Sequence, residues 1–333
     1  MIGPQFGIRE YLSRIPTADL YVLNPVRHLR RHSVRAARLP RIRCLVPNVY
    51  AIGSTGVIVR YAAAEDLDLL RRSGVRRILY VADDDFVAGA ADASLPDRYR
   101  AKLAAFAGGA WPVIREAADI VIVPGSVLAS QYGAKARILS PVWHRPPAAT
   151  AHFEAAGQIE VVHLGTGSHV SDIAAIAAPL AAVLQAKENV RLTLFSAGPA
   201  PGPLQRCANV RLRRPMPWWR YKLMLPRMRF HLALYPLRDT AFNRARSSNK
   251  LFEHALVGAA SLMSPMPALS DAAGDASSPV FVRGGEEEWR QRIEADLSDM
   301  QALRRRADAI RSHIVAADLP GRAVEEWLDM LGL

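Results

Sequence analysis

The chain has 333 residues, of which 50% are hydrophobic and 22% are charged, and its formal net charge at pH 7 is +12. This composition excludes a disordered chain, and the length allows two domains of ordinary size. The positive charge favours an anionic partner, which would be a phosphorylated substrate, an anionic membrane surface or a nucleic acid.

Short apolar or β-branched runs alternate with helical patterns along the whole chain. In the first half, the predicted strands are 19–23, 57–60, 77–81, 120–123 and 137–139, and the predicted helices are 64–73 and 97–118. In the second half, the predicted strands are 159–164, 191–196, 210–213, 231–235, 259–263 and 280–282, and the predicted helices are 169–185, 218–227, 248–257, 287–312 and 322–331. Such alternation is typical of α/β domains with parallel sheets and helices on both faces.

Residues 140–157 read as a linker, because Pro141, Pro146 and Pro147 disfavour regular structure and small residues follow them. We therefore expect one domain over residues 1–150, a second over residues 151–318, and a final helix at 319–333 that crosses back to the first domain. Two doubly wound domains joined in this way enclose a cleft, and ligands bind such sheets at the carboxyl ends of the strands.

The densest positive run lies at residues 26–43 and has an apolar stripe opposite its charges. Its arginines include Arg27, Arg30, Arg31, Arg35, Arg38 and Arg43. A basic residue near an anionic membrane contributes about 1 kcal/mol to binding. The run from Arg27 to Arg43 therefore predicts contact with an anionic membrane surface or a lipid-diphosphate acceptor, with a solvated helix face as the alternative.

Three adjacent carboxylates, Asp83, Asp84 and Asp85, follow the predicted strand 77–81. One interpretation is a divalent-metal site that holds a diphosphate. In a second interpretation they line the cleft, and Asp84 acts as a base toward an acceptor hydroxyl. The third is a solvated loop, since Asp is a common turn residue.

A glycine-containing loop, Gly165, Thr166 and Gly167, follows the predicted strand 159–164, and His169 lies in the first turn of the next helix. Glycines let backbone N–H groups approach a phosphate closely. The loop lacks the full dinucleotide-binding pattern. It predicts a phosphate contact in the cleft, with a simple tight turn as the alternative.

Aromatic side chains stand among arginines at residues 206–230, including Trp218, Trp219 and Tyr221. Such a mixture can stack bases of a nucleic acid or the base of one nucleotide. We expect most of these aromatics to pack a helix on the sheet, with one near a nucleobase. The sequence has no recognised nucleic-acid module, so no nucleic-acid partner is expected.

The strongest signal lies at residues 234–264, where Arg246, Ser247 and Lys250 gather near a helix start and Glu253 follows one turn later. A helix N-terminus and nearby cations favour a diphosphate, and a carboxylate one turn on can accept hydrogen bonds from ribose hydroxyls. This spacing predicts a nucleotide-sugar site, and a solvated ion pair is the alternative.

The segments GTGSHVSD and PLRDTAFNRARSSNKLFEHALVGAASLMS resemble the C-terminal domain of bacterial GT-B glycosyltransferases, and ILYVADDDF resembles the end of a strand in their N-terminal domain. The resemblance covers most of residues 55–285 and is closest to glycosyltransferase family 4. It implies two Rossmann-like domains facing a cleft. It also implies transfer of a sugar from a nucleoside-diphosphate sugar to a hydroxyl of a cell-surface glycan or its lipid carrier, with retention of configuration.

The resemblance also implies roles for single residues. Glu253 would bind the ribose, and Lys250 would lie near the diphosphate. Arg246, Ser247 and Asn243 would line the donor loop, while Gly165, Thr166, Gly167 and His169 would face the cleft. Asp84, His169 and Lys250 are the expected catalytic residues, with cationic groups in place of a metal and no cofactor. Ala245 stands where many family members carry a first glutamate, which puts the usual contact to the donor sugar in doubt.

Two rival functions remain at this point: a metal-dependent transferase centred on Asp83–Asp85, and a non-catalytic nucleic-acid-binding protein. The isolated Cys44 and Cys207 argue against a disulfide framework or a zinc site. The first residues lack the apolar core of a signal peptide, and no apolar run is long enough for a membrane span. The sequence therefore predicts a cytoplasmic protein, or one on the inner face of the cytoplasmic membrane.

Overall fold

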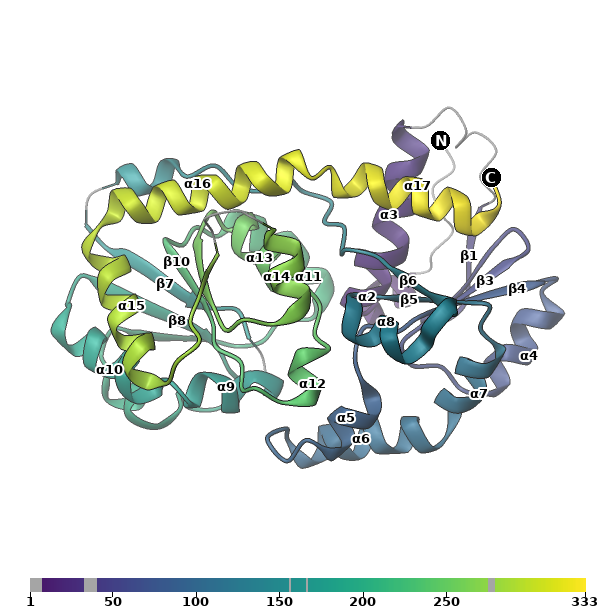
Figure 1. Ribbon diagram of the computed structural model, residues 1–333, viewed down its shortest axis with the longest axis horizontal. Helices are drawn as coiled ribbons and strands as arrows, with labels where there is room; N and C mark the ends of the chain where they lie inside the picture. The colour runs from purple at the N-terminus through teal and green to yellow at the C-terminus, as the bar shows by residue number, and fades with distance from the viewer. Residues whose placement is uncertain (1–7, 33–40, 156, 166, 275–278) are drawn as a thin grey trace.

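A computed structural model describes residues 8–32, 41–155, 157–165, 167–274 and 279–333, and it contains two six-stranded sheets (Figure 1). For residues 8–10, 29–32 and 168 only the backbone is described. Each sheet lies between layers of helices, so the predicted α/β class with helices on both sheet faces is confirmed.

The first sheet combines an antiparallel edge with a parallel body. Its strands are β1 (Ile42–Val46), β2 (Val49–Ile52), β3 (Thr55–Val59), β4 (Arg77–Val81), β5 (Ile120–Val123) and β6 (Ala136–Ile138), in that spatial order. The pairs β1–β2 and β2–β3 are antiparallel, whereas β3 to β6 are parallel. The four parallel strands therefore point their carboxyl ends to one edge of the sheet.

The two faces of the first sheet have different covers. Side chains alternate along each strand, so Leu79 and Val81 of β4 face one layer while Ile78 and Tyr80 face the other. The second layer is made by α4 (Glu65–Arg72), α5 (Phe86–Ala91), α6 (Asp97–Gly108), α7 (Ala110–Ala117) and α8 (Ser126–Tyr132). The first layer is made by α2 (Pro16–Ala18), the π-helical turn η1 (Asp19–Leu23), α3 (Asn24–His32) and α17 (Leu319–Leu331).

The second sheet is parallel throughout and has the Rossmann strand order. Its strands are β7 (Ile159–His163), β8 (Val190–Phe195), β9 (Val210–Arg213), β10 (Leu232–Tyr235), β11 (Ala260–Met263) and β12 (Val280–Phe281). In space they follow the order β12-β11-β10-β7-β8-β9. The chain reverses its winding between β7 and β10, and the carboxyl ends of these neighbours mark the switch point at which ligands bind in such sheets.

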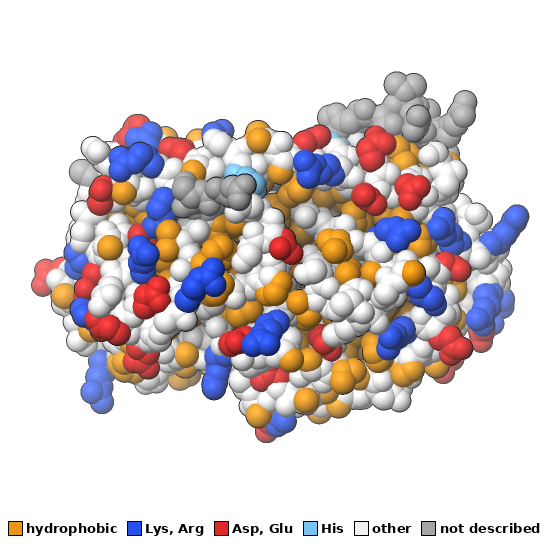
Figure 2. Space-filling model, viewed as in Figure 1, with side chains coloured by type: hydrophobic (Ala, Val, Ile, Leu, Met, Phe, Trp, Pro, Cys, Tyr) orange, Lys and Arg blue, Asp and Glu red, His pale blue; other side chains and the backbone are white. Residues whose placement is uncertain are grey.

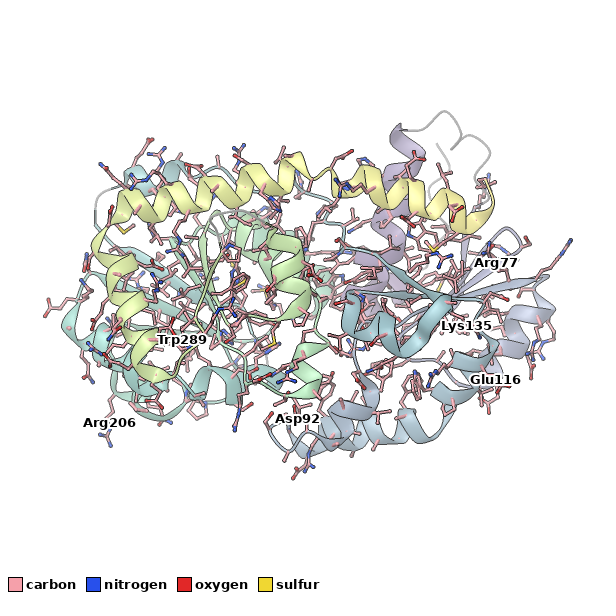
Figure 3. The ribbon with its side chains drawn as sticks, viewed as in Figure 1. Arg77, Asp92, Glu116, Lys135, Arg206 and Trp289 are labelled. Atoms are coloured by element: carbon pink, nitrogen blue, oxygen red, sulfur yellow. The ribbon has the colours of Figure 1, made fainter. Side chains whose placement is uncertain are left out.

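Helices cover both faces of the second sheet as well. They are α9 (Val170–Ala174), α10 (Ala177–Ala186), α11 (Trp218–Met224), α13 (Asn249–Leu256), α14 (Pro267–Ala273), α15 (Glu286–Ser298) and α16 (Met300–Ala316). The short helix α12 (Ala241–Arg244) instead contacts α5, and its Phe242 is buried in the helical layer of the first sheet. Leu180 of α10 and Trp289 of α15 share a core with β7 and β8 on one face (Figure 3). Leu256 of α13 and Leu225 pack on the opposite face.

Two connections join the halves of the molecule. Residues 139–150 contain no helix or strand and lead from β6 toward the second sheet, and the predicted boundary near residue 150 falls in this stretch. In the other direction, α16 and α17 run along one side of both halves, and α17 lies beside α3 (Figure 1). The indole N–H of Trp327 in α17 donates to the Tyr21 carbonyl at 3.0 Å.

Several elements differ from those expected. Residues 19–23 form a buried π-helical turn and not a strand, because a short apolar run looks alike in a buried strand and a buried helix. No strand was predicted at β1 or β2, which form a hairpin that begins in the last residues of the basic run and continues past it. The helix expected at 97–118 is divided at Gly109, and the helix expected at 169–185 is divided between Ala174 and Ala177.

The basic run of residues 26–43 is described only in part. Its first residues belong to α3, Arg35 and Arg38 lie outside the described residues, and Arg43 lies in β1. On the face in Figure 2, cationic and acidic side chains are interspersed over both halves. Within the described residues, no helix has the length and apolar character that crossing a membrane requires.

Candidate functional site

A cleft of about 400 Å³ lies between the two domains at the carboxyl ends of their parallel strands. The first domain lines it with Pro16, Thr17, Arg60, Asp83, Asp84 and Tyr99. The second domain contributes the polar residues His169, Arg246, Ser247, Asn249, Lys250 and Glu253. Its apolar lining consists of Leu164, Phe195, Pro215, Met216, Trp218, Tyr221 and Tyr235. The structure thus brings together Asp84, His169, Arg246, Ser247, Lys250 and Glu253, all of which the sequence singled out.

Glu253 lies on α13 with its carboxylate at the cleft and its side chain only 3% exposed. Lys250 Nζ lies 2.5 Å from Glu253 Oε2 and also donates to the Leu164 carbonyl at 2.8 Å. Leu164 directly follows β7, so this lysine joins α13 to the switch point of the sheet. The predicted i,i+3 pair is therefore real, and it lies in the cleft and not on the solvated surface.

Two neutral donors complete the surroundings of this carboxylate. Asn249 Nδ2 donates to Glu253 Oε1 at 2.7 Å, and the Tyr221 hydroxyl donates to Oε2 at 2.9 Å. Trp143 Nε1 holds the other end of the Asn249 amide at 2.9 Å. Burial and the charge of Glu253 raise the pKa of Tyr221 well above its usual value, so this phenol keeps its proton at neutral pH.

Arg246 brings a second cation into the cleft, and part of its donor capacity is unused. Its Nε and Nη2 atoms are buried and have no hydrogen-bond partner among the described residues. Its guanidinium lies over the Phe242 ring at 4.6 Å from the centroid. A guanidinium stays charged and offers five N–H donors, so an anion in the cleft would satisfy the unused ones.

His169 is buried at the mouth of the loop after β7, and its Nδ1 lies 3.0 Å from Asp172 Oδ2. Burial, together with the charges of Arg246 and Lys250, lowers the pKa of His169 well below its usual value. The imidazole is therefore neutral at pH 7. With the Asp172 carboxylate accepting from Nδ1–H, Nε2 is the acceptor nitrogen.

Not every predicted residue reaches the cleft. Asn243 is buried and turned inward, where its Nδ2 donates to the Arg238 carbonyl at 2.9 Å and to Asp172 Oδ1 at 3.4 Å. It thus fixes the loop that carries Arg246, and it does not line the cleft. Gly165 and Gly167 lie in the loop but outside the lining, and Thr166 lies outside the described residues.

We predict that Gly165→Ala lowers the free energy of unfolding by about 1–3 kcal/mol, the usual cost of overpacking a tight site. A Cβ atom at Gly165 would lie 2.1 Å from His163 Nε2 and 2.7 Å from His169 Cβ. His163 cannot yield easily because it is buried and its Nδ1 is bonded to the Leu234 carbonyl at 3.1 Å. Denaturant unfolding measures the change.

The matched control for this prediction is Gly167→Ala in the same loop, where no described residue other than its chain neighbours lies within 4 Å of the added atom. It should change the unfolding free energy by no more than about 0.5 kcal/mol. Equal stability of both variants would show that the loop tolerates a side chain at Gly165.

On the first-domain side, Arg60 organises the carboxylates. Its guanidinium is paired with both Asp83 and Asp84 and donates to the Tyr99 hydroxyl at 3.0 Å. Thr17 from α2 donates a hydrogen bond to Asp83. Arg60 has a left-handed backbone with φ of 60°, which is costly for a non-glycine residue and aims this side chain across the strand ends.

The three aspartates do not point to one place. Asp85 caps α5 by accepting from the Ala88 N–H at 2.9 Å, and it also accepts from Gln131 Nε2 at 2.6 Å. Asp83 and Asp84 face Arg60 in the cleft. Among the described residues, no cluster of three His, Cys, Asp or Glu side chains has the arrangement of a metal site.

Aromatic rings form much of the apolar side of the cleft. Tyr221 packs against the core of the second sheet as expected, whereas Trp218 packs against the core of the first domain. Both also line the cleft, where one aromatic of this tract was expected, and their ring centroids lie 6.0 Å apart. Phe195 stands edge-on to Tyr221 at 6.2 Å. These rings make a surface that suits a flat heterocycle.

Several lining residues were not singled out by the sequence analysis, including Thr17, Arg60 and Tyr99. Arg60 had one usable signal, since it ends the strand predicted at 57–60 and so lies at the ligand-binding edge of a parallel sheet. Thr17 and Tyr99 come from helices, and nothing in their local sequence distinguishes them.

Comparison with known proteins gives the fold. No protein-family model matches the chain, and no curated protein matches it. Sucrose-phosphate synthase from Thermosynechococcus elongatus matches with a TM-score of 0.59 and 13% identity, over 84% of this chain and 74% of that one.

Two further solved structures are similar. Anabaena HepE in complex with UDP-glucose matches with a TM-score of 0.55 and 13% identity, over 83% of this chain and 78% of that one. WaaG, a glycosyltransferase involved in lipopolysaccharide biosynthesis, matches with a TM-score of 0.52 and 14% identity, over 78% and 80%. With these neighbours and two Rossmann-like halves around a cleft, the chain has the GT-B fold that its sequence segments resembled.

Proposed function

We propose that this protein transfers a glycosyl group from a nucleoside-diphosphate sugar to a hydroxyl of an acceptor. The observation that carries the proposal is the cleft at the switch point of the second sheet, into which Arg246 brings N–H donors that have no partner in the described part of the chain, beside Lys250 and Glu253. The GT-B fold supports it, as does the UDP-glucose named for HepE.

The lining residues suggest a division of roles. The aromatic wall of Phe195, Trp218 and Tyr221 would hold the base, and Glu253 would accept from the ribose. Arg246 and Lys250 would face the diphosphate and stabilise its charge as it leaves, as oriented cations do in phosphate-leaving reactions. These cations take the part that a metal plays in other transferases, so we propose a reaction without a metal cofactor.

In the reaction, the bond between the anomeric carbon and the diphosphate oxygen breaks, and a bond from the acceptor oxygen to that carbon forms. The acceptor hydroxyl gives its proton to the Asp84 carboxylate, and the nucleoside diphosphate leaves with the bonding electrons. His169 with its neutral imidazole and Asp84 on the opposite wall are the groups we propose to contact the reacting hydroxyls. Retention of configuration is proposed from the likeness to family 4.

We further propose that the acceptor belongs to cell-surface glycan or glycolipid synthesis at the cytoplasmic side of the membrane. The basic run from Arg27 to Arg43, part of which lies in α3, supports contact with an anionic surface. The lipopolysaccharide role named for WaaG is consistent with such an acceptor.

Arg246→Ala tests the proposal. We expect it to weaken the affinity for the best-binding nucleoside diphosphate by about 10- to 100-fold, because a charge-assisted hydrogen bond contributes about 1.5–3 kcal/mol. Isothermal titration calorimetry with UDP, GDP, ADP and CDP measures it. Arg206→Ala is the matched control, since Arg206 is exposed at the outer edge of the second domain (Figure 3). Equal affinities of wild type and Arg246→Ala would contradict the assignment.

A further inference from the structure

The Glu253 carboxylate, which the proposed function gives to the ribose, already has three donors. Asn249 Nδ2 donates to Oε1 at 2.7 Å, while the Tyr221 hydroxyl and Lys250 Nζ contact Oε2 at 2.9 Å and 2.5 Å. An ionised carboxylate offers about four lone-pair positions. Only one is therefore left, although the neighbouring hydroxyls of a ribose need two.

The three donors differ in how easily they can leave. The Asn249 amide is fixed at its other end by Trp143 Nε1, at 2.9 Å. The Tyr221 ring is fixed between Phe195 and Trp218, at centroid distances of 6.2 Å and 6.0 Å. Neither donor has another acceptor among the contacts described at the cleft.

Lys250 is the donor that a ligand can remove. Its ammonium ends a flexible stem, its side chain is 16% exposed at the cleft, and it is the one charged donor of the three. It also donates to the Leu164 carbonyl at 2.8 Å, but an ammonium has three N–H donors, so that bond does not require the contact with Glu253. A diphosphate in the cleft would offer it anionic oxygens in exchange for Glu253. Moving Lys250 leaves two donors on the carboxylate and frees the two positions that a ribose needs.

We propose that Lys250 is an internal competitor that occupies the ribose-binding carboxylate until a diphosphate draws it away. The inference rests on the proposed function and adds a regulation of that same site. The diphosphate and nucleoside parts of the donor then bind cooperatively, because the first removes an obstacle to the second. The cleft thereby selects intact nucleoside diphosphates over nucleosides, although both carry the same base and ribose.

The experiment measures this coupling in the wild-type protein. Calorimetry first identifies which of UDP, GDP, ADP and CDP binds best. The matching free nucleoside is then titrated alone and in the presence of saturating inorganic pyrophosphate. We expect pyrophosphate to tighten nucleoside binding by about fivefold or more, the range of ordinary coupling between two sites. By the same linkage, the nucleoside must tighten pyrophosphate binding by an equal factor.

A variant checks that Lys250 carries the coupling. In Lys250→Met the nucleoside alone should bind more tightly than to wild type, the nucleoside diphosphate should bind more weakly, and pyrophosphate should no longer help. Lys135→Met is the matched control, because Lys135 is exposed on the first domain and contacts the Glu116 carbonyl (Figure 3). It should reproduce the wild-type coupling.

The outcomes separate the two proposals. If none of the four nucleoside diphosphates binds, the proposed function fails and the coupling fails with it. If a nucleoside diphosphate binds, but pyrophosphate leaves the nucleoside affinity of the wild type unchanged or weaker, the coupling is overturned and the proposed function stands. The wild-type measurement decides this even where Lys250→Met is too unstable to study.

Discussion

Asp19→Asn is expected to lower the free energy of unfolding by about 3–5 kcal/mol, as is typical when one member of a buried ionic network is neutralised. The Asp19 carboxylate is 1% exposed and joins the two domains. It accepts from Arg14 at 2.9 Å in the first domain, and from Trp218 Nε1 at 2.7 Å and Lys222 Nζ at 2.5 Å on α11 of the second. The substitution leaves the buried Lys222 ammonium without this anion.

Denaturant unfolding at pH 7 measures this loss. Asp68→Asn is a suitable control because Asp68 pairs with Arg71 at the surface, with both side chains more than 60% exposed. Exposed pairs contribute at most about 1 kcal/mol. Equal effects of the two substitutions would mean that the Asp19 network adds no more than a surface pair.

The same network should show in the pH dependence of stability. Burial alone would raise the pKa of Asp19, but the hydrogen bond from Lys222 and the charges of Arg14 and Lys222 lower it overall. A carboxyl group with a lowered folded-state pKa stabilises the fold above its unfolded pKa of about 3.9, and this contribution is lost as the pH falls further. The stability difference between wild type and Asp19→Asn should therefore shrink below about pH 4.

Trp327→Ala is expected to cost about 3–5 kcal/mol of unfolding free energy, the usual range for removing a large buried aromatic side chain. Trp327 is fully buried against the helical layer of the first sheet, although it follows the whole second domain in the chain. Its N–H bond to the Tyr21 carbonyl also ties α17 to the turn that carries the neighbouring Asp19. Thermal and denaturant unfolding report the change.

Trp327→Phe separates packing from the hydrogen bond. It keeps a large ring and loses the N–H donor, so it should cost less than Trp327→Ala, with about 1–3 kcal/mol from the carbonyl left unsatisfied. A cost below about 1 kcal/mol for Trp327→Ala would show that α17 is dispensable for the first core.

Much of the fold could be predicted because the strands carry a local signal. Apolar and β-branched residues make up all of the run at 120–123 and four of the five residues at 77–81, and both runs are strands with those limits. The run at 19–23 has similar composition, yet it is a helical turn, because it is buried among α17 and the first sheet. Burial on all sides removes the periodicity that distinguishes helix from strand.

For the site as well, local sequence predicts only part of what the fold brings together. Lys250 and Glu253 share one face of α13 and Arg246 lies in the loop just before it, so their convergence on one cleft could be expected from the sequence. Arg60, Tyr99 and Thr17 come from separate elements and meet Asp83 and Asp84 only in the folded chain. Asn243 belongs to the predicted motif, but its amide supports the loop backbone, and spacing cannot distinguish that use from a ligand contact.

The return of α17 to the first sheet has a consequence for synthesis on the ribosome. The layer that covers one face of that sheet includes Val324, Trp327 and Leu328, which are translated after all of the second domain. At about 5–20 residues per second, the first domain waits some tens of seconds for its last packing partners. During that interval its apolar face is open to chaperones and to other nascent chains, so the order of the chain makes the synthesis of α17 the step that closes the first core.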